Sequence, residues 1–320
     1  MKALILAGGF ATRLWPLTEQ RAKPLLILNG KTILAHLLDK IPETMETILL
    51  TNKKFEQHFQ EELHRLKRRN VEIFCEDAHA EGEKLGALRA VSVAIQHYHI
   101  NESIIILAGD NLLPELNIEQ LFCSEKEASI AVQDVGDTFE ARKFGVIEIN
   151  PNDPDSVIGF EEKPTSPRST LVSTGCTSIG KDLFPKLHDL SQRSPDRLGD
   201  IFSHLLEHQT PIRAIQVPGA WFDVGSFDTY LAAHRQLQTP AIQIHPTAKV
   251  SLNQCSGKVF IGPGCVVKNC KIRDSILYEN SILENCSLSS VIIDENCDLE
   301  GLDLNHKLIR RQTKLKSKHA

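Results

Sequence analysis

The chain has 320 residues, of which 41% are hydrophobic and 24% charged, a balance typical of a globular protein with a sizeable core, here in two domains. The formal net charge of -5 argues against a general nucleic-acid binder. Because the sequence has no apolar run of about 18 residues and no signal-peptide pattern, we expect a cytoplasmic protein without membrane or nucleic-acid partners.

The N-terminal segment has the pattern of a buried strand, residues 2–7, that runs directly into a turn with a glycine pair. We expect Gly8 and Gly9 to adopt positive φ and to let the backbone approach a ligand closely. Arg13 adds a fixed cation to this turn, and Lys23 adds a second one before the next apolar run. The segment therefore predicts a place that holds phosphates, and the alternative is an ordinary surface turn.

Two familiar phosphate loops do not fit this turn. A Walker A loop requires Gly-Lys-Ser/Thr at its end, and the dinucleotide fingerprint requires three spaced glycines that open a helix. Here the glycine pair is followed by Phe10-Ala11-Thr12-Arg13 and soon by Pro16, which disfavours a continuing helix.

Strand-like and helix-like runs alternate in the following part of the chain. The expected strands are residues 46–51, 71–76 and 103–108, and the expected helices are residues 55–69 and 85–98. This alternation predicts an α/β fold with a Rossmann-like, mostly parallel sheet flanked by helices on both faces. Ligands of such sheets lie at the carboxyl ends of the strands, where Gly8 and Asp110 both fall.

Two aspartates are candidate metal ligands. Asp110 follows the strand at residues 103–108, and Asp223 lies in the compact segment at residues 221–225. A carboxylate beside bound phosphates requires a cation, and Mg²⁺ is held by one or two carboxylates together with phosphate oxygens. We therefore expect Asp110 and Asp223 to converge on one Mg²⁺. Taken singly, each has the pattern of a turn residue or a helix cap.

An acid and a base stand side by side at Glu162 and Lys163, before a rigid proline and at the end of another expected strand. The carboxylate can accept hydrogen bonds from sugar hydroxyls, and the ammonium can bind a phosphate. A solvated surface ion pair is the alternative interpretation.

The C-terminal part repeats in blocks of 16 residues without a gap: IGPGCVVKNCKIRDSI, LYENSILENCSLSSVI and IDENCDLEGLDLNHKL. Apolar residues recur every five or six positions, which suits stacked coils of three short parallel strands, preceded by an imperfect coil at residues 244–260. Four of the eight cysteines lie in these blocks, and we expect them to be small stacked residues rather than metal ligands. The expected interior residues are Ile261, Val267, Ile272, Leu277, Leu283, Leu288, Ile293 and Leu299.

Taken together and in this order, these segments resemble the nucleotidyltransferases that join a nucleoside triphosphate to a sugar 1-phosphate. The C-terminal blocks resemble the left-handed β-helix of hexapeptide repeats, which long members of that family carry. The resemblance covers residues 1–237 and rests on the N-terminal turn, Gly109-Asp110, Phe144-Gly145-Val146-Ile147-Glu148, Glu161-Glu162-Lys163-Pro164, Ser173-Thr174-Gly175 and Trp221-Phe222-Asp223-Val224-Gly225.

The resemblance implies one in-line displacement, in which the anomeric phosphate attacks the α-phosphorus and pyrophosphate leaves without a covalent enzyme intermediate. By the same resemblance, Arg13 would bind the leaving pyrophosphate, Lys23 would bind the reacting phosphates, and the two aspartates would bind Mg²⁺. Lys163 would hold the phosphate of the sugar 1-phosphate, and Glu162 its hydroxyls. The other residues that it implies are Leu6, Ala7, Gly8, Gly9, Ala11, Thr12, Glu76 and Gly86 for the nucleotide, and Gly145, Gly175 and Trp221 for the sugar phosphate.

The substrate pair stays open because the chain departs from the family's pattern near the expected base site. Glu76 stands where the family often has glutamine or glutamate, and a carboxylate accepts from the N–H groups of guanine as well as from that of thymine or uracil. Gly86 lacks the following threonine of many members. Ala11 replaces a common glycine, which would cost about 1 kcal/mol in a left-handed conformation. Gly109-Asp110-Asn111 and the overall spacing most resemble the branch of the family that transfers thymidylyl or uridylyl groups to glucose 1-phosphate, with mannose-1-phosphate guanylyl transfer as the alternative.

An alternative of another class is that the chain is a non-catalytic, sugar-nucleotide-binding regulatory subunit. The presence of the charged site residues argues against this alternative. An acyltransferase site in the β-helix is disfavoured, because His306 is the one histidine in the three blocks. We expect a catalytic domain at residues 1–240, a β-helix at 241–308 and a solvated basic tail at 309–320. A solenoid of three to four coils is close to the minimum for stability, and we therefore expect the β-helix to contact the first domain or to form a homo-oligomer.

Overall fold

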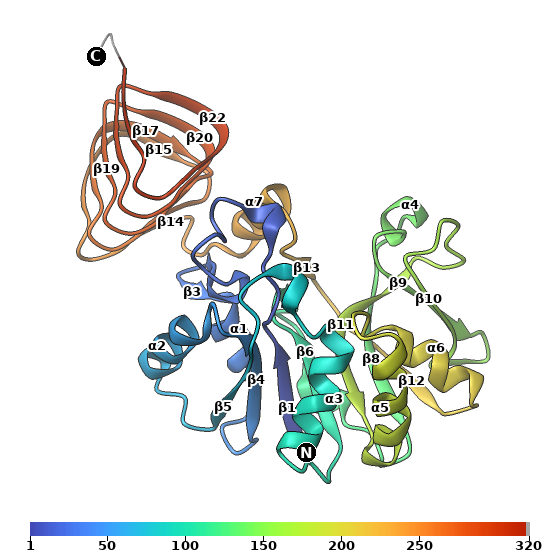
Figure 1. Cartoon of the computed structure of the whole chain (residues 1–320). Helices are drawn as coiled ribbons and strands as arrows, with labels where there is room; N and C mark the ends of the chain where they lie inside the picture. The colour runs from blue at the N-terminus through green and yellow to red at the C-terminus, as the bar shows by residue number, and fades with distance from the viewer. Residues whose placement is uncertain (318–320) are drawn as a thin grey trace. The chain divides into compact units, whose positions relative to one another are not determined.

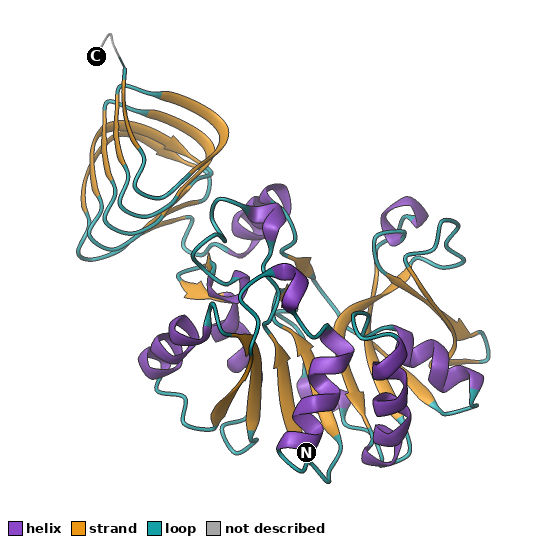
Figure 2. Cartoon of the chain, viewed as in Figure 1, coloured by secondary structure: helices purple, strands orange, loops and turns teal. Residues whose placement is uncertain are grey.

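The computed structural model describes residues 1–317 of the chain (Figures 1 and 2). Contacts divide the chain into two compact units. The first unit contains residues 1–9 and 34–223, and the second contains residues 10–33 and the chain from residue 224 onward. The N-terminal turn with Arg13 and Lys23 thus belongs to the same unit as the C-terminal repeats. The boundary expected near residue 240 remains a prediction.

The first unit is built on a nine-stranded sheet with the order β5-β4-β1-β6-β11-β8-β12-β10-β9. Its first four strands are parallel, as the alternation predicted, and Figure 1 shows them side by side. The rest of the sheet is mixed, because short connections such as the one between β9 and β10 only permit antiparallel neighbours. The strands are β1 (Lys2–Leu6), β4 (Thr47–Asn52), β5 (Val71–Glu76), β6 (Ile104–Ala108), β8 (Ala128–Asp134), β9 (Gly145–Asn150), β10 (Asp153–Glu162), β11 (Leu171–Ile179) and β12 (Ile212–Gln216).

Helices cover both faces of this sheet (Figure 2). Leu4 and Ile106 point to one face and pack in a single cluster with apolar residues of α3, α5 and α6, whereas Ile5 and Ile105 are buried on the other face. The predicted α/β fold is therefore confirmed. The helices are α1 (Ile33–Leu38), α2 (Glu56–Leu66), α3 (Ala87–His97), α4 (Thr138–Ala141), α5 (Phe184–Arg193) and α6 (Asp200–Glu207), with 3₁₀ turns at Glu81–Glu83, Ile118–Leu121 and Lys181–Leu183.

The second unit joins the segment of residues 10–33 to one helix and the β-helix. The segment contains 3₁₀ turns at Thr12–Leu14 and Lys23–Leu25 and the hairpin of β2 (Ile27–Leu28) and β3 (Lys31–Thr32), and the helix is α7 (Phe227–Leu237). The β-helix strands are β14 (Ile242–Ile244), β15 (Lys249–Ser256), β16 (Val259–Ile261), β17 (Val266–Arg273), β18 (Ile276–Leu277), β19 (Ile282–Glu284), β20 (Ser287–Ile293), β21 (Asp298–Glu300), β22 (Asp303–Ile309) and β23 (Lys314–Lys316).

The register of the β-helix confirms the 16-residue repeat. Parallel pairing aligns Val267 with Leu283 and Leu283 with Leu299, and it aligns Ile261 with Leu277 in the same way. All eight predicted interior residues are buried. The cysteine positions also stack: the side chains of Cys265, Ser281 and Cys297 each donate to the backbone carbonyl thirteen residues ahead. One coil thus binds the next through a small polar side chain.

The structure differs from the sequence analysis in the basic tail. Residues 314–316 form β23, which pairs in parallel with β21 and continues the stack. The chain supplies one more apolar residue at the repeat spacing, Leu315, opposite Leu299. Residues 318–320 lie outside the described residues. Among residues 1–317, no helix is both long and apolar enough to cross a membrane.

The backbone of the N-terminal turn also differs from expectation. Neither Gly8 nor Gly9 adopts a left-handed φ, so the prediction of positive φ at both was wrong. The left-handed residue is Ala11, with φ 50° and ψ 44°, just before the 3₁₀ turn at Thr12–Leu14. Gly8 has a different role, because a Cβ there would lie 3.0 Å from Oε1 of Glu76.

Replacing Ala11 with glycine is expected to stabilise the protein by about 1 kcal/mol, because glycine adopts the left-handed conformation without a steric penalty. The melting temperature, measured by differential scanning fluorimetry, should rise by about 2–4 °C. The control is Ala232→Gly on the exposed face of α7, where the same replacement should destabilise. A lower melting temperature for Ala11→Gly would show that the left-handed conformation does not strain Ala11.

Candidate functional site

A cavity of about 340 Å³ in the first unit is lined by both candidate metal ligands, and we call it the aspartate cavity. The structure brings Asp110 and Asp223 together here with every residue that the sequence analysis assigned to the sugar phosphate. Those residues are Gly145, Glu162, Lys163, Gly175 and Trp221.

A short two-stranded pairing brings together the two aspartates, which are far apart in the sequence. β7 (Asn111–Leu112) pairs antiparallel with β13 (Phe222–Asp223), which sets Asn111 opposite Asp223. The Asn111 amide donates to Oδ1 of Asp110 at 2.9 Å, and Trp221 Nε1 donates to the Asn111 side-chain oxygen at 2.6 Å. Asn111 therefore orients the Asp110 carboxylate from the side of Trp221.

The donor set of the aspartate cavity fits a divalent cation. Two carboxylates beside one amide oxygen make a set of hard oxygen donors, which Mg²⁺ prefers over nitrogen or sulfur. An ion held there would neutralise negative charge that gathers on reacting phosphates.

Lys163 has a strained backbone at the rim of this cavity. Its φ is 48°, in the left-handed region that residues other than glycine seldom adopt, and its N–H donates to the Phe144 carbonyl at 3.0 Å. The Lys163 ammonium lies 3.8 Å from a carboxylate oxygen of Glu162. Burial raises the pKa of Glu162, and Lys163 opposes that rise. The cavity thus holds a half-buried carboxyl beside a mostly exposed cation.

Three charged residues of the aspartate cavity escaped the sequence analysis: Lys143, Asp196 and Arg197. Asp196 and Arg197 lie in the loop before α6, and no strand end or glycine pair pointed to them. The nearest signal was Gly199, where a Cβ would lie 2.8 Å from Oε2 of Glu162. That close approach is created by the fold and has no local sequence pattern.

A second cavity of about 180 Å³ lies at the carboxyl ends of β1, β4 and β5, and we call it the apolar cavity. Its walls include Leu50, Phe74 and Ala90, and Asp196 lines it as well as the aspartate cavity. Of the residues that the sequence analysis assigned to the nucleotide, it contains Leu6, Gly8, Gly9, Glu76 and Gly86. Ala7 is buried behind this surface.

Glu76 is the main acid of the apolar cavity. Its Oε2 accepts a hydrogen bond from the Leu85 amide at 2.9 Å, and its Oε1 faces Gly8. Burial raises the pKa of Glu76, while the Leu85 amide and the Lys84 ammonium oppose that rise. The Thr51 hydroxyl, also in the cavity wall, is buried without a hydrogen-bond partner among residues 1–317. An acceptor and an unsatisfied hydroxyl together favour a ligand that carries hydrogen-bonding groups.

Gly86 is required where the apolar cavity meets α3. Its φ is +89°, and a Cβ there would lie 2.6 Å from the Pro195 carbonyl oxygen. Any larger residue would therefore push the loop of Asp196 away from α3.

The remaining predicted residues lie in the second unit. Ala11 precedes the first 3₁₀ turn of the N-terminal segment, Thr12 and Arg13 lie in this turn, and Lys23 begins the next one. Their roles toward a nucleotide remain predictions.

Comparison with known proteins identifies the family. A family model described as nucleotidyl transferase matches residues 2–239. The chain belongs to this family. The matched residues include those that line both cavities, and the match confirms the resemblance found in the sequence.

Three curated relatives are identical to the chain at a little over a quarter of the aligned positions. The bifunctional protein GlmU of Methanocaldococcus jannaschii is 29% identical over 270 residues, which are 83% of this chain and 61% of that protein. The UTP–glucose-1-phosphate uridylyltransferase AglF of Haloferax volcanii is 29% identical over 254 residues, 76% of this chain and 99% of the relative. A putative mannose-1-phosphate guanyltransferase of Sulfolobus acidocaldarius is 26% identical over 291 residues, 87% and 76% of the two chains.

The chain spans about three fifths of the length of the GlmU relatives that it matches. Among solved structures, a putative glucose-1-phosphate thymidylyltransferase from Bacillus anthracis, in complex with a sucrose, has a TM-score of 0.64 at 23% identity. The similarity covers 75% of this chain and 96% of that one, and it supports the fold.

Proposed function

We propose that this nucleotidyl transferase family member is an enzyme that transfers a nucleotidyl group from a nucleoside triphosphate to a sugar 1-phosphate, with Mg²⁺, and releases pyrophosphate. The observation that carries the proposal is the aspartate cavity, where Asp110 and Asp223 lie with Lys163 and Glu162. A pair of aspartates, a further acid and a lysine around one cavity suit a reaction between two phosphates, which requires charge neutralisation and positioning more than a protein nucleophile.

In the proposed reaction the sugar phosphate is the nucleophile. Lys163 binds this phosphate and Glu162 accepts hydrogen bonds from the sugar hydroxyls, so that a phosphate oxygen faces the α-phosphorus of the triphosphate. The new oxygen–phosphorus bond forms as the bond to the bridging oxygen breaks, and pyrophosphate leaves. Arg13 and Lys23 bind the charged phosphates, and Asp110 and Asp223 are the residues that would hold Mg²⁺.

For the nucleotide we propose uracil or thymine in the apolar cavity, and glucose 1-phosphate as the acceptor. Support comes from the similarity to AglF, almost all of which the chain covers, and from the Glu76 carboxylate of the apolar cavity, which can accept the N–H of either base. Guanylyl transfer to mannose 1-phosphate is the second candidate, because one carboxylate can accept both N–H donors of guanine and because a relative carries that name.

The test is pyrophosphate release by the purified full-length chain with Mg²⁺, over a matrix of UTP, dTTP and GTP against glucose, N-acetylglucosamine and mannose 1-phosphates. We expect the highest kcat/KM with UTP or dTTP and glucose 1-phosphate. A best rate with GTP and mannose 1-phosphate would select the second candidate. If no pair releases pyrophosphate while sugar nucleotides still bind, the chain is a regulatory, sugar-nucleotide-binding subunit instead.

Replacing Glu76 with glutamine separates the two bases. Uracil offers one N–H, which a glutamine oxygen still accepts, so kcat/KM for UTP should fall by roughly threefold or less. Guanine offers two donors to one carboxylate, and its kcat/KM should fall by roughly 100-fold, since an unpaired donor costs about 1–3 kcal/mol. The control is Asp77→Asn, whose exposed side chain lines neither cavity.

The same variant gives a pH test. Burial raises the pKa of Glu76, and only the ionised carboxylate accepts from the base with both oxygens. In the unaltered chain kcat/KM for GTP should therefore fall as the pH is lowered through this raised pKa, and kcat/KM for UTP should change by roughly threefold or less, whereas the Glu76→Gln variant should lack the decrease with GTP. A decrease shared by both would assign the titration to another group.

A further inference from the structure

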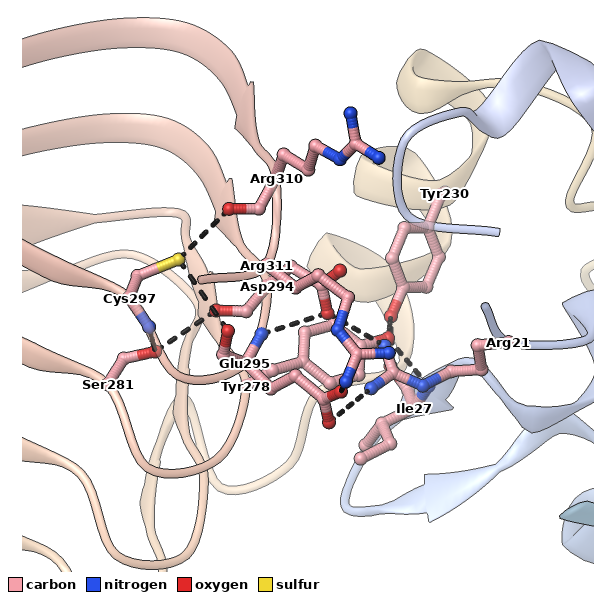
Figure 3. A network of polar contacts seen from close by, with 10 residues as sticks. All are labelled: Arg21, Ile27, Tyr230, Tyr278, Ser281, Asp294, Glu295, Cys297, Arg310 and Arg311. Carbon is pink, nitrogen blue, oxygen red and sulfur yellow. Dashed lines mark hydrogen bonds and ion pairs between the residues drawn. The ribbon is translucent and has the colours of Figure 1, made fainter. Parts of the chain in front are cut away.

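A buried polar cluster in the second unit connects the segment of residues 10–33 to the β-helix (Figure 3). Arg21 is its centre: its guanidinium donates to Asp294 at 3.1 Å and to Glu295 at 3.2 Å, and it lies 4.3 Å over the centre of the Tyr278 ring. The three charged side chains are 18%, 3% and 14% exposed. An ion pair this buried has a large effect if one partner is removed.

The cluster also holds the backbone of Ile27. The Ile27 N–H donates to the Tyr278 hydroxyl at 3.2 Å, and the Tyr230 hydroxyl donates to the Ile27 carbonyl at 2.7 Å. The two hydroxyls lie 2.7 Å apart. Because Tyr230 uses its proton on Ile27, Tyr278 must be the donor to Tyr230, and the three bonds close a ring in which every group is satisfied.

The cluster extends to further side chains of the β-helix. Arg311 pairs with Glu295 at 2.7 Å, and Arg310 pairs with Glu19 at 2.6 Å. Burial raises the pKa of Asp294, and Arg21 opposes that rise. Segment 10–33 is thus bound to one side of the β-helix at residues 19, 21 and 27.

Lys23 lies between the two strongest of these attachments. Ala22 is fully buried, and the 3₁₀ turn that follows is closed by hydrogen bonds from Leu25 to Ala22 and from Leu26 to Lys23. A stretch fixed at residue 21 and at residue 27, with a tight turn between, leaves the Lys23 backbone little freedom. The β-helix makes two of the contacts that flank Lys23, those with Arg21 and with the Ile27 N–H.

We propose that the β-helix positions the phosphate-binding segment of the enzyme, with Arg21 and Tyr278 as positioning residues that act through Lys23. The inference rests on the proposed function, because it takes Lys23 as a ligand of the triphosphate. The C-terminal repeats would thus contribute to nucleotidyl transfer without binding a ligand themselves.

Three full-length variants test the proposal: Arg21→Met, Tyr278→Phe and, as a matched control, Arg235→Met. Arg235 of α7 also bonds to the β-helix, at Ser290, but it does not contact segment 10–33 in any described interaction. Initial rates with varied UTP and glucose 1-phosphate, or with the best pair found above, give kcat and KM for each substrate.

We expect kcat/KM for the triphosphate to fall between roughly tenfold and 100-fold in Arg21→Met, because misplacing a binding group by about 1 Å can cost about 100-fold. The fall should be smaller in Tyr278→Phe, and Arg235→Met should match the unaltered chain. KM for the sugar 1-phosphate should change by less than about twofold throughout, because its proposed ligands lie elsewhere. Equal effects on both substrates, or none, would overturn the proposal.

A double variant separates positioning from stability. Arg21→Met leaves Asp294 buried without its cation, so this variant loses stability as well as geometry. Adding Asp294→Asn removes the unpaired charge and should restore much of the melting temperature, yet the kinetic defect should persist because the attachment is still absent. If kinetics recover together with the melting temperature, Arg21 is a stabilising residue only.

Two measurements without turnover keep the inference distinct from the proposed function. Hydrogen exchange followed by mass spectrometry should show faster exchange of amides 21–27 in Arg21→Met and Tyr278→Phe, with the β-helix unchanged. Calorimetric titration with Mg·UTP should show weaker binding in the same variants. If the unaltered chain binds Mg·UTP but releases no pyrophosphate, the proposed activity fails while weaker binding by the variants still supports positioning; unchanged exchange and affinity would refute it.

Discussion

Replacing either Asp110 or Asp223 with asparagine is expected to lower kcat by about 10³-fold with the fold intact. Both residues line the aspartate cavity: Asp223 lies on β13, and Asp110 directly precedes the neighbouring strand β7. Asparagine keeps the shape and one oxygen but removes the charge that a divalent cation requires. Loss of that charge stabilisation, about 4 kcal/mol in the transition state, corresponds to this factor.

The two aspartates should act as one group. The double variant is expected to be no more than about threefold slower than the worse single variant, because each single replacement already removes the cation that both carboxylates would hold. Mg²⁺ with UTP should raise the melting temperature of the unaltered chain and leave that of both variants unchanged. Asp155→Asn, on the exposed part of β10, is the matched control. Retention of more than about a tenth of the activity in either variant would refute the paired role.

Replacing Lys163 with methionine is expected to lower kcat/KM for the sugar 1-phosphate by roughly 10² to 10³-fold, the range for loss of one donor at a reacting centre. Methionine keeps the apolar stem and removes the ammonium that would bind the nucleophilic phosphate. Methionine must adopt the same strained φ of 48° as lysine, so the replacement changes the side chain without changing the backbone strain.

Kinetics with each substrate varied in turn checks this result. KM for the triphosphate should change by less than about twofold, because the proposed ligands of the triphosphate are other residues. Lys181→Met is the control, since Lys181 pairs with Glu125 at 2.7 Å and lines neither cavity. A defect that falls equally on both substrates would reassign Lys163 from the sugar phosphate to the triphosphate.

The fold was largely predictable because its signals are local. Residues 71–76 were expected to form a strand and are β5, and the other predicted strands and helices differ from the observed ones by a few residues at their ends. In the β-helix, each coil repeats the same apolar positions, so the register of Leu283 between Val267 and Leu299 follows from the spacing alone.

The mixed half of the sheet was less predictable. Antiparallel β10 and β11 depend on which strands lie beside each other, and the sequence carries no local record of a neighbour. The conformation of the N-terminal turn was also missed. A glycine pair permits positive φ without requiring it, and the turn uses Ala11 for that purpose instead.

By itself the sequence determined the strand and helix pattern, the 16-residue repeat and the residues on which the family resemblance rests, because each of these is encoded in neighbouring positions. The sequence also predicted that Asp110 and Asp223 converge, but the tertiary structure alone decided that Arg197 lines the same cavity and that Arg21 is buried against Asp294. These groups are far apart in the chain, and only the packing of complete elements brings such side chains within reach of one another.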